Sequence, residues 1–60
     1  MMFPVTGRSV RGLSLIACET VVRALERATD LMRRGYDDVL IADARGAQFT
    51  PDQFTRFYPA

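Results

Sequence analysis

The stretch that decides the fold runs from Thr20 to Gly35 and reads TVVRALERATDLMRRG. At about 100° per residue, its apolar and charged side chains fall on opposite sides, which predicts an amphipathic helix. The apolar side holds Val21, Ala24, Leu25, Ala28, Leu31 and Met32, and the charged side holds Arg23, Glu26, Arg27, Asp30, Arg33 and Arg34. Thr20 is the expected N-cap, and Gly35 can end the helix in a left-handed conformation, with Tyr36 folding back on Leu31.

Charged residues along this helix are spaced for ion pairs, since opposite charges three or four residues apart are neighbours on a helix surface. The pairs that this spacing predicts are Glu19–Arg23, Arg27–Asp30 and Asp30–Arg34.

Alternating apolar residues predict two strands before the helix. Met2–Thr6 is the first and Leu13–Cys18 is the second, and the glycine-bounded segment Gly7–Gly12 (GRSVRG) is expected to be a hairpin loop. In the second strand, Leu13, Leu15 and Ala17 share one face, and Ser14, Ile16 and Cys18 share the other. Because Pro4 has no N–H, the first strand is expected at an edge of the sheet, or with the proline nitrogen facing solvent.

After the helix, Val39–Asp43 is a third strand, apolar on both faces, which is typical of a central or doubly covered strand. Asp43 to Gly46 is expected to be a type I turn, leading into a short fourth strand at Ala47–Phe49. Thr50 and Gln53 have the spacing of a capping box around Pro51, so a short helix is predicted from Pro51 to about Phe57. Phe49 and Phe54 are spaced as its hydrophobic staple.

These elements predict a single α+β domain over residues 1–60, with one main helix packed on a small three- to four-stranded mixed sheet. The element order is β-β-α-β-β, followed by a short C-terminal helix. A right-handed crossover through the main helix places the second and third strands parallel to each other. The first strand has two possible places: between those two, or at an edge as Pro4 favours.

The segment from Ala17 to Phe54 resembles a group of small bacterial β-β-α-β proteins. These proteins have a helix ending in R-R-G, a V-x-I-x-D strand, a turn ending in glycine, and a T-P-x-x-F helix. The residues that carry the resemblance are Arg33, Arg34, Gly35, Val39, Ile41, Asp43, Gly46, Thr50, Pro51 and Phe54. The resemblance implies folding signals and brings no catalytic residue. It departs at the N-terminus, where those proteins have a tighter D-G hairpin than the Gly7–Gly12 loop expected here.

Composition argues against catalysis, a cofactor or a metal site. The chain has no histidine and one cysteine, Cys18, which without a histidine partner is expected to be a buried structural thiol. Asp43 and Asp52 could approach each other and hold Mg²⁺, but bonding to turn amides and a helix-dipole role explain them better. We therefore expect a protein that is not an enzyme and that carries neither a cofactor nor a metal ion.

The sequence favours neither a membrane-spanning helix nor a secretion signal. No run approaches the roughly 18 apolar residues that a membrane-spanning helix needs. The sequence Leu15-Ile16-Ala17-Cys18 resembles a lipoprotein cleavage box, but its apolar segment begins only at Leu13, shorter than the roughly seven residues of a signal peptide. A cytoplasmic protein is expected.

Chain length favours self-association. In a chain of 60 residues, apolar burial and lost conformational entropy nearly cancel, and no disulfide or metal is expected to compensate. Aromatic residues concentrate near the C-terminus, and aromatic anchors are enriched in protein interfaces. The sequence thus predicts an interaction module, either a homodimer or a binder of another protein, that uses the open sheet face and the C-terminal aromatics. The expected contact residues are Phe49, Phe54, Phe57, Tyr58 and Leu40.

Nucleic-acid binding is the alternative function. All eight basic residues are arginines set against seven acids, so the net charge of +1 gives no strong field toward a polyanion. Arg8 and Arg11, however, lie in the glycine-bounded segment with no acidic residue between them. They are the expected contacts if the chain binds RNA or DNA.

Overall fold

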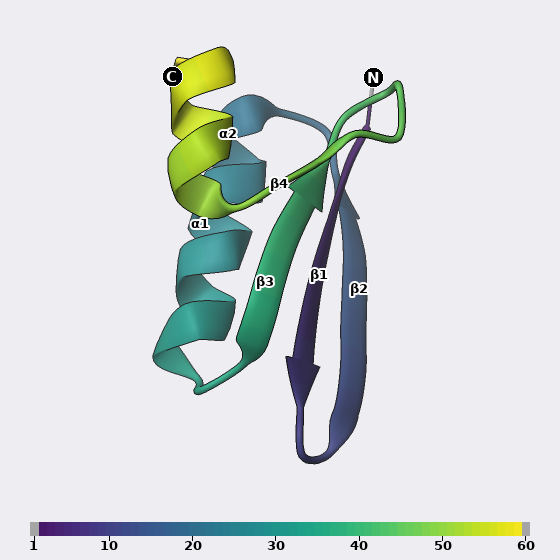
Figure 1. The fold of residues 1–60 in the computed structure, drawn as a ribbon, viewed down its shortest axis with the longest axis vertical. Coiled ribbons are helices and arrows are strands. Elements are labelled where there is room, and N and C mark those ends of the chain that lie inside the picture. Colours follow the sequence, from purple (N-terminus) through teal and green to yellow (C-terminus); the bar gives the residue numbers. More distant parts are fainter. Residues whose placement is uncertain (1, 60) are drawn as a thin grey trace.

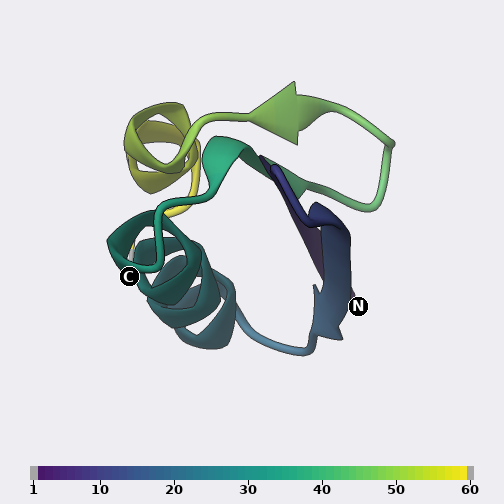
Figure 2. The same cartoon turned by 90° about the horizontal axis from the view of Figure 1, so that it is seen from below.

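The computed structural model describes residues 2–59 and shows a four-stranded sheet with both helices on one face (Figures 1 and 2). The elements follow in the order β1 (Phe3–Ser9), β2 (Gly12–Cys18), α1 (Val21–Arg33), β3 (Asp37–Ala42), β4 (Gln48–Phe49) and α2 (Pro51–Phe57). The α+β class, the main helix and the short C-terminal helix are confirmed.

The strands lie in the order β2-β1-β3-β4, and each neighbouring pair is antiparallel. The expectation of a mixed sheet is therefore wrong, although β2 and β3 do run parallel to each other with β1 between them. The edge position that Pro4 favoured for β1 is also wrong. Pro4 is tolerated because pairing of β1 with β3 begins only at Val5, so the proline lies just outside that ladder.

The N-terminal hairpin is tighter than its glycines suggest. Ser9 pairs with Gly12 across the two-residue turn of Val10 and Arg11, so the expected long loop is mostly strand. Gly7 lies inside β1, and a Cβ there would come within 3.2 Å of Leu31 and 3.3 Å of Tyr36. Its role is thus to let α1 approach the sheet closely rather than to turn the chain.

Both helices have the caps that the sequence predicts. Thr20 accepts a hydrogen bond from the Arg23 amide, and Thr50 and Gln53 form a complete capping box. At the end of α1, Gly35 has φ +87°, and the Tyr36 amide donates to the Leu31 carbonyl at 3.0 Å. These contacts fix where each helix begins and ends.

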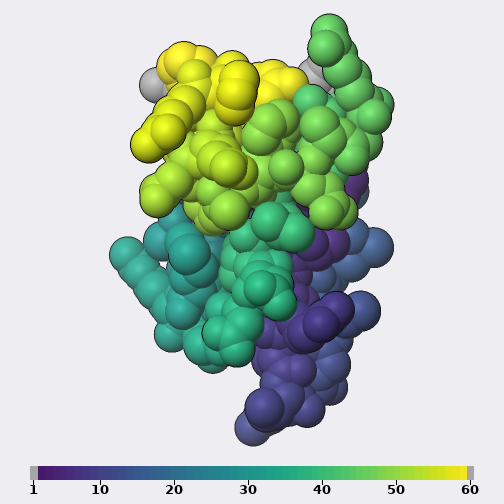
Figure 3. Space-filling view, viewed as in Figure 1, coloured from purple at the N-terminus to yellow at the C-terminus, as the bar shows by residue number. Residues whose placement is uncertain are grey.

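The core lies between the sheet and the two helices. α1 packs on β1, β2 and β3, whereas α2 packs on β3, β4 and α1. The buried residues that fill this layer are Phe3, Val5, Cys18, Ala24, Ala28, Leu31, Val39, Ile41 and Phe54. Figure 3 shows α2, in yellow-green, covering one end of the molecule, while the tip of the β1–β2 hairpin projects at the other.

Candidate interaction surface

One face of the sheet carries leucines. Within residues 2–59 no helix lies over this face (Figure 2). The register sets Leu15 opposite Thr6, and Thr6 opposite Leu40, across three adjacent strands. Because Phe3 and Val5 point into the core, these residues point the other way. Leu15 is 69% exposed and Leu13, on the same side of β2, is 76% exposed. We call this surface the open face, and it is formed by Pro4, Thr6, Arg8, Leu13, Leu15, Ala17, Leu40, Ala42 and Gln48.

The structure separates the expected contact residues. Leu40 belongs to the open face and is half-buried, whereas Phe49 lies in register with Ile41 on the helix-covered face. Phe54 is fully buried, so it contributes to the chain's own core and not to a surface. The five residues therefore do not form one patch.

The other C-terminal aromatics pack mainly on one another. The Phe54 ring stacks on Tyr58 at 4.8 Å and meets Phe3 edge-on at 5.5 Å between centroids. Phe57 keeps 68% of its surface exposed, and its ring lies 5.3 Å from that of Phe49. Phe57 is thus the one residue of the predicted aromatic contact that is mostly available to a partner.

A buried carboxylate ties α2 to the β3–β4 turn. Asp43 accepts hydrogen bonds from the amides of Arg45 at 2.9 Å and Ala47 at 3.0 Å, and from the Tyr58 hydroxyl at 3.1 Å. Burial raises the pKa of Asp43, but these three hydrogen bonds and the charge of Arg45 outweigh it, so the pKa is below its ordinary value. Burial and the neighbouring Asp43 raise the pKa of Tyr58. The turn-bonding role expected for Asp43 is confirmed.

No acidic cluster suited to a metal ion occurs in the part of the chain that the structure describes. Cys18 is buried in the core, as the structural interpretation requires. The residues Leu15 to Cys18, which resemble a cleavage box, form the second half of β2 and pair with Phe3 to Thr6. Among residues 2–59, no helix is long and apolar enough to cross a membrane.

The basic segment at the hairpin tip has an acidic neighbour. Arg8 lies in β1 opposite Asp37 of β3, and Arg11 lies in the turn. Arg11, Arg34 and Asp37 line one hollow beside that turn. The structure thus brings Arg8 and Arg11 to one end of the molecule but places a carboxylate beside them, which weakens their attraction for phosphate.

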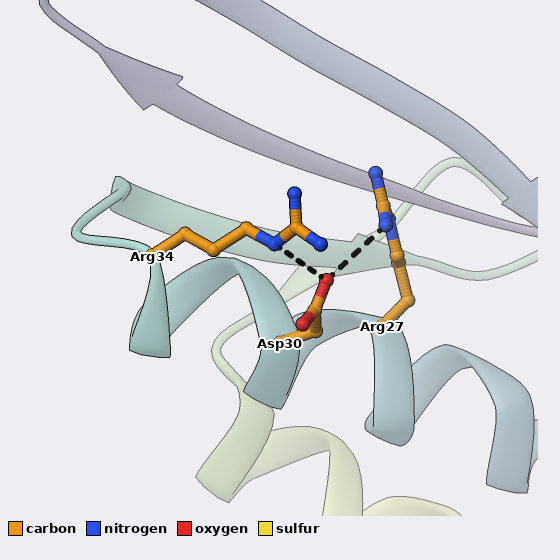
Figure 4. Close-up of polar contacts among 3 residues, drawn as sticks. All are labelled: Arg27, Asp30 and Arg34. Atoms are coloured by element: carbon orange, nitrogen blue, oxygen red, sulfur yellow. Dashed lines mark hydrogen bonds and ion pairs between the residues drawn. The ribbon is translucent and has the colours of Figure 1, made fainter.

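Charged side chains along α1 and at its two ends form a stripe on the side of the β1–β2 hairpin. We call it the α1 stripe, and its residues are Glu19, Arg23, Glu26, Arg27, Asp30 and Arg34. Asp30 Oδ2 lies 3.3 Å from Arg27 Nη1 and 3.1 Å from Arg34 Nε (Figure 4), so two of the predicted ion pairs are confirmed. The third, Glu19–Arg23, does not form. Arg27 Nε is buried without a hydrogen-bond partner. A second hollow, between β2 and α1, is lined by Ile16, Ala17, Cys18, Glu19, Arg23, Glu26 and Arg27.

Leu13 and Leu15 are the surface residues that sequence reasoning did not single out. Both faces of the second strand are apolar, so alternation alone gave no reason to choose which one the helix covers. Comparison with known proteins adds no functional assignment, because no family model, curated protein or solved structure matches the chain.

Proposed function

We propose that this protein is a small interaction module that associates with a second copy of itself through the leucines of the open face. The observation that supports the proposal is the exposure of Leu13 and Leu15 on the same face of the sheet as half-buried Leu40. Fully burying a leucine stabilises an assembly by about 1.5–3 kcal/mol, so a contact over these side chains is favourable. A cytoplasmic location forms part of the proposal.

The sheet order supports the same surface. β2 is an edge strand of seven residues, and within the described part of the chain its only neighbouring strand is β1. A long, apolar edge strand offers unpaired backbone groups to another chain. The exposed leucines and the free edge belong to one strand, so one partner can engage both.

The test is the oligomeric state measured by sedimentation velocity over a range of protein concentrations. We expect a dimer at micromolar concentration, and we expect Leu15→Lys to shift it to monomer because two like-charged ammonium groups would meet at the contact. Phe57→Ser is the matched comparison, since it removes another exposed apolar side chain but on α2. A wild-type chain that stays monomeric at high concentration would refute self-association.

The same variants separate the two expected surfaces. Loss of the dimer in Phe57→Ser and its persistence in Leu15→Lys would place the contact on the C-terminal aromatics. A salt-dependent shift with RNA that disappears on Arg8→Ala plus Arg11→Ala, in a chain that stays monomeric, would instead support nucleic-acid binding.

A further inference from the structure

We infer that the second copy joins along β2, antiparallel to it and related by a two-fold axis at Leu15, so that two four-stranded sheets become one of eight strands. This inference rests on the proposed self-association and specifies its geometry. It follows from two independent features: the direction of the free backbone groups of β2 and the order of charges along α1.

The first feature is the free edge of β2. Ser9 and Gly12 pair on either side of a two-residue turn, where both residues exchange backbone hydrogen bonds. Hydrogen-bonded and non-hydrogen-bonded pairs alternate along an antiparallel ladder. Leu13, Leu15 and Ala17 therefore turn their N–H and C=O groups away from β1, toward the free edge.

These three residues select one register. With Leu15 opposite the partner's Leu15, Leu13 lies opposite the partner's Ala17, and every outward N–H and C=O in the strand finds a partner. Because only every second residue has its backbone groups at the free edge, the register can change only in steps of two residues. A shift of one such step leaves the edge-facing N–H and C=O of one residue in each copy without a partner. Unmade backbone hydrogen bonds at a buried edge are costly. The side chains of Leu13, Leu15 and Ala17 all lie on the open face, so this register also gathers the exposed leucines of both copies into one row.

The second feature is the charge order of the α1 stripe, which lies beside β2. Ile16, the neighbour of the proposed axis, shares a hollow with Glu26 and Arg27 from the middle of the stripe. A two-fold axis at Leu15 makes the stripes of the two copies run antiparallel. The first residue of one stripe then faces the last residue of the other, the second faces the second-to-last, and so on. In that arrangement every facing pair has opposite signs: Glu19 with Arg34, Arg23 with Asp30, and Glu26 with Arg27.

The charge order excludes the other orientation. A parallel arrangement of the same two stripes would set each residue against its own copy, with like charges facing along the whole length. Glu19, Arg23 and Glu26 form no ion pair within the described chain, which leaves them available to a partner. Complementary charges of this kind fix the orientation and register of an interface.

The experiment places single cysteines on the open face in a Cys18→Ala background and oxidises the folded protein. In Leu15→Cys the two thiols lie on opposite sides of the axis, with Cα atoms about 5.5 Å apart, which a disulfide can span. In Leu13→Cys, an equally exposed leucine of the same strand, they lie about 13 Å apart along the strands. We expect at least a tenfold faster cross-link in Leu15→Cys, and a fast cross-link between Leu13→Cys and Ala17→Cys chains when these are mixed.

Charge reversal tests the same geometry in the wild-type background, without any change to the core. Arg23→Glu is expected to weaken the dimer about three- to tenfold at low salt, because it sets like charges opposite Asp30 of the partner subunit. Arg33→Glu changes the net charge equally, but in the proposed arrangement position 33 faces the uncharged Thr20 of the partner subunit, so the dimer constant is expected to stay unchanged.

The outcomes separate the two proposals. A wild-type monomer at every concentration refutes self-association and with it the present inference. A wild-type dimer in which Leu15→Cys and Leu13→Cys cross-link at equal rates, or in which Arg23→Glu and Arg33→Glu act alike, overturns the edge-to-edge geometry and leaves self-association standing.

Discussion

Phe54 and Phe57 have the same side chain on the same short helix, and the structure predicts opposite consequences for their replacement. Phe54 is fully buried among Phe3, Phe49 and Tyr58, whereas Phe57 is mostly exposed. Phe54→Leu removes three carbons from the core, a loss of roughly 2 kcal/mol at about 0.8 kcal/mol per buried carbon. With an unfolding entropy of about 0.13 kcal/mol/K for a chain of this size, the Tm should fall by about 15 °C.

A larger truncation should abolish folding. Phe54→Ala costs about 3–5 kcal/mol, and a domain of this length is expected to have only about 3–9 kcal/mol in total. Thermal unfolding followed by circular dichroism, with all variants at one protein concentration, measures both effects. Phe57→Leu is the control and should change the free energy of unfolding by less than about 0.5 kcal/mol. Equal Tm losses for Phe54→Leu and Phe57→Leu would refute the assignment of Phe54 to the core.

Four further predictions concern other contacts. Gly7→Ala should lower the free energy of unfolding in urea by about 1–3 kcal/mol, because the added methyl meets Leu31 and the core cannot expand freely. Thr50→Ala removes the N-cap of α2 and should cost about 1 kcal/mol in the same assay, with Thr55→Ala outside the capping box as comparison. Because the pKa of Asp43 is lowered in the folded protein, its carboxylate stabilises the fold at pH values above the ordinary pKa of 3.8, and this stabilisation is lost as the pH falls through the pKa of the folded state. Measurements of Tm from about pH 2 to 6 should show this loss. Asp43→Asn should make the Tm less dependent on pH in that range. The raised pKa of Tyr58 affects stability at alkaline pH. The free energy of unfolding should decline as the pH rises above 10.0, and Tyr58→Phe should remove that decline.

Local signals sufficed for the helices and the turn between β3 and β4. Thr20 and Gly35 bound α1 because capping and left-handed glycine are properties of a few adjacent residues. The same holds for the capping box of α2, where Thr50 and Gln53 satisfy each other's backbone amides.

The features of the sheet that the sequence does not predict depend on contacts between residues far apart in the chain. The glycine pattern places Gly7 in a loop, although its function depends on Leu31 and Tyr36, which are more than 20 residues away in the sequence. Pro4 favours an edge in the sequence because its missing donor matters only where a second ladder reaches it, and the ladder between β1 and β3 begins only at Val5. Which face of β2 meets the helix also depends on packing, since Leu15 and Ile16 are both apolar.

The two borders of the sheet are unequal, and this bears on how large an assembly can become. At one border β2 offers seven residues, whereas at the other β4 offers only two, Gln48 and Phe49. When two copies pair through β2, the β2 edge of both copies is occupied, so no third copy can add at that edge. This arrangement favours a closed dimer over a filament, because a filament would require the short β4 edge to pair with another copy as well as the β2 edge does.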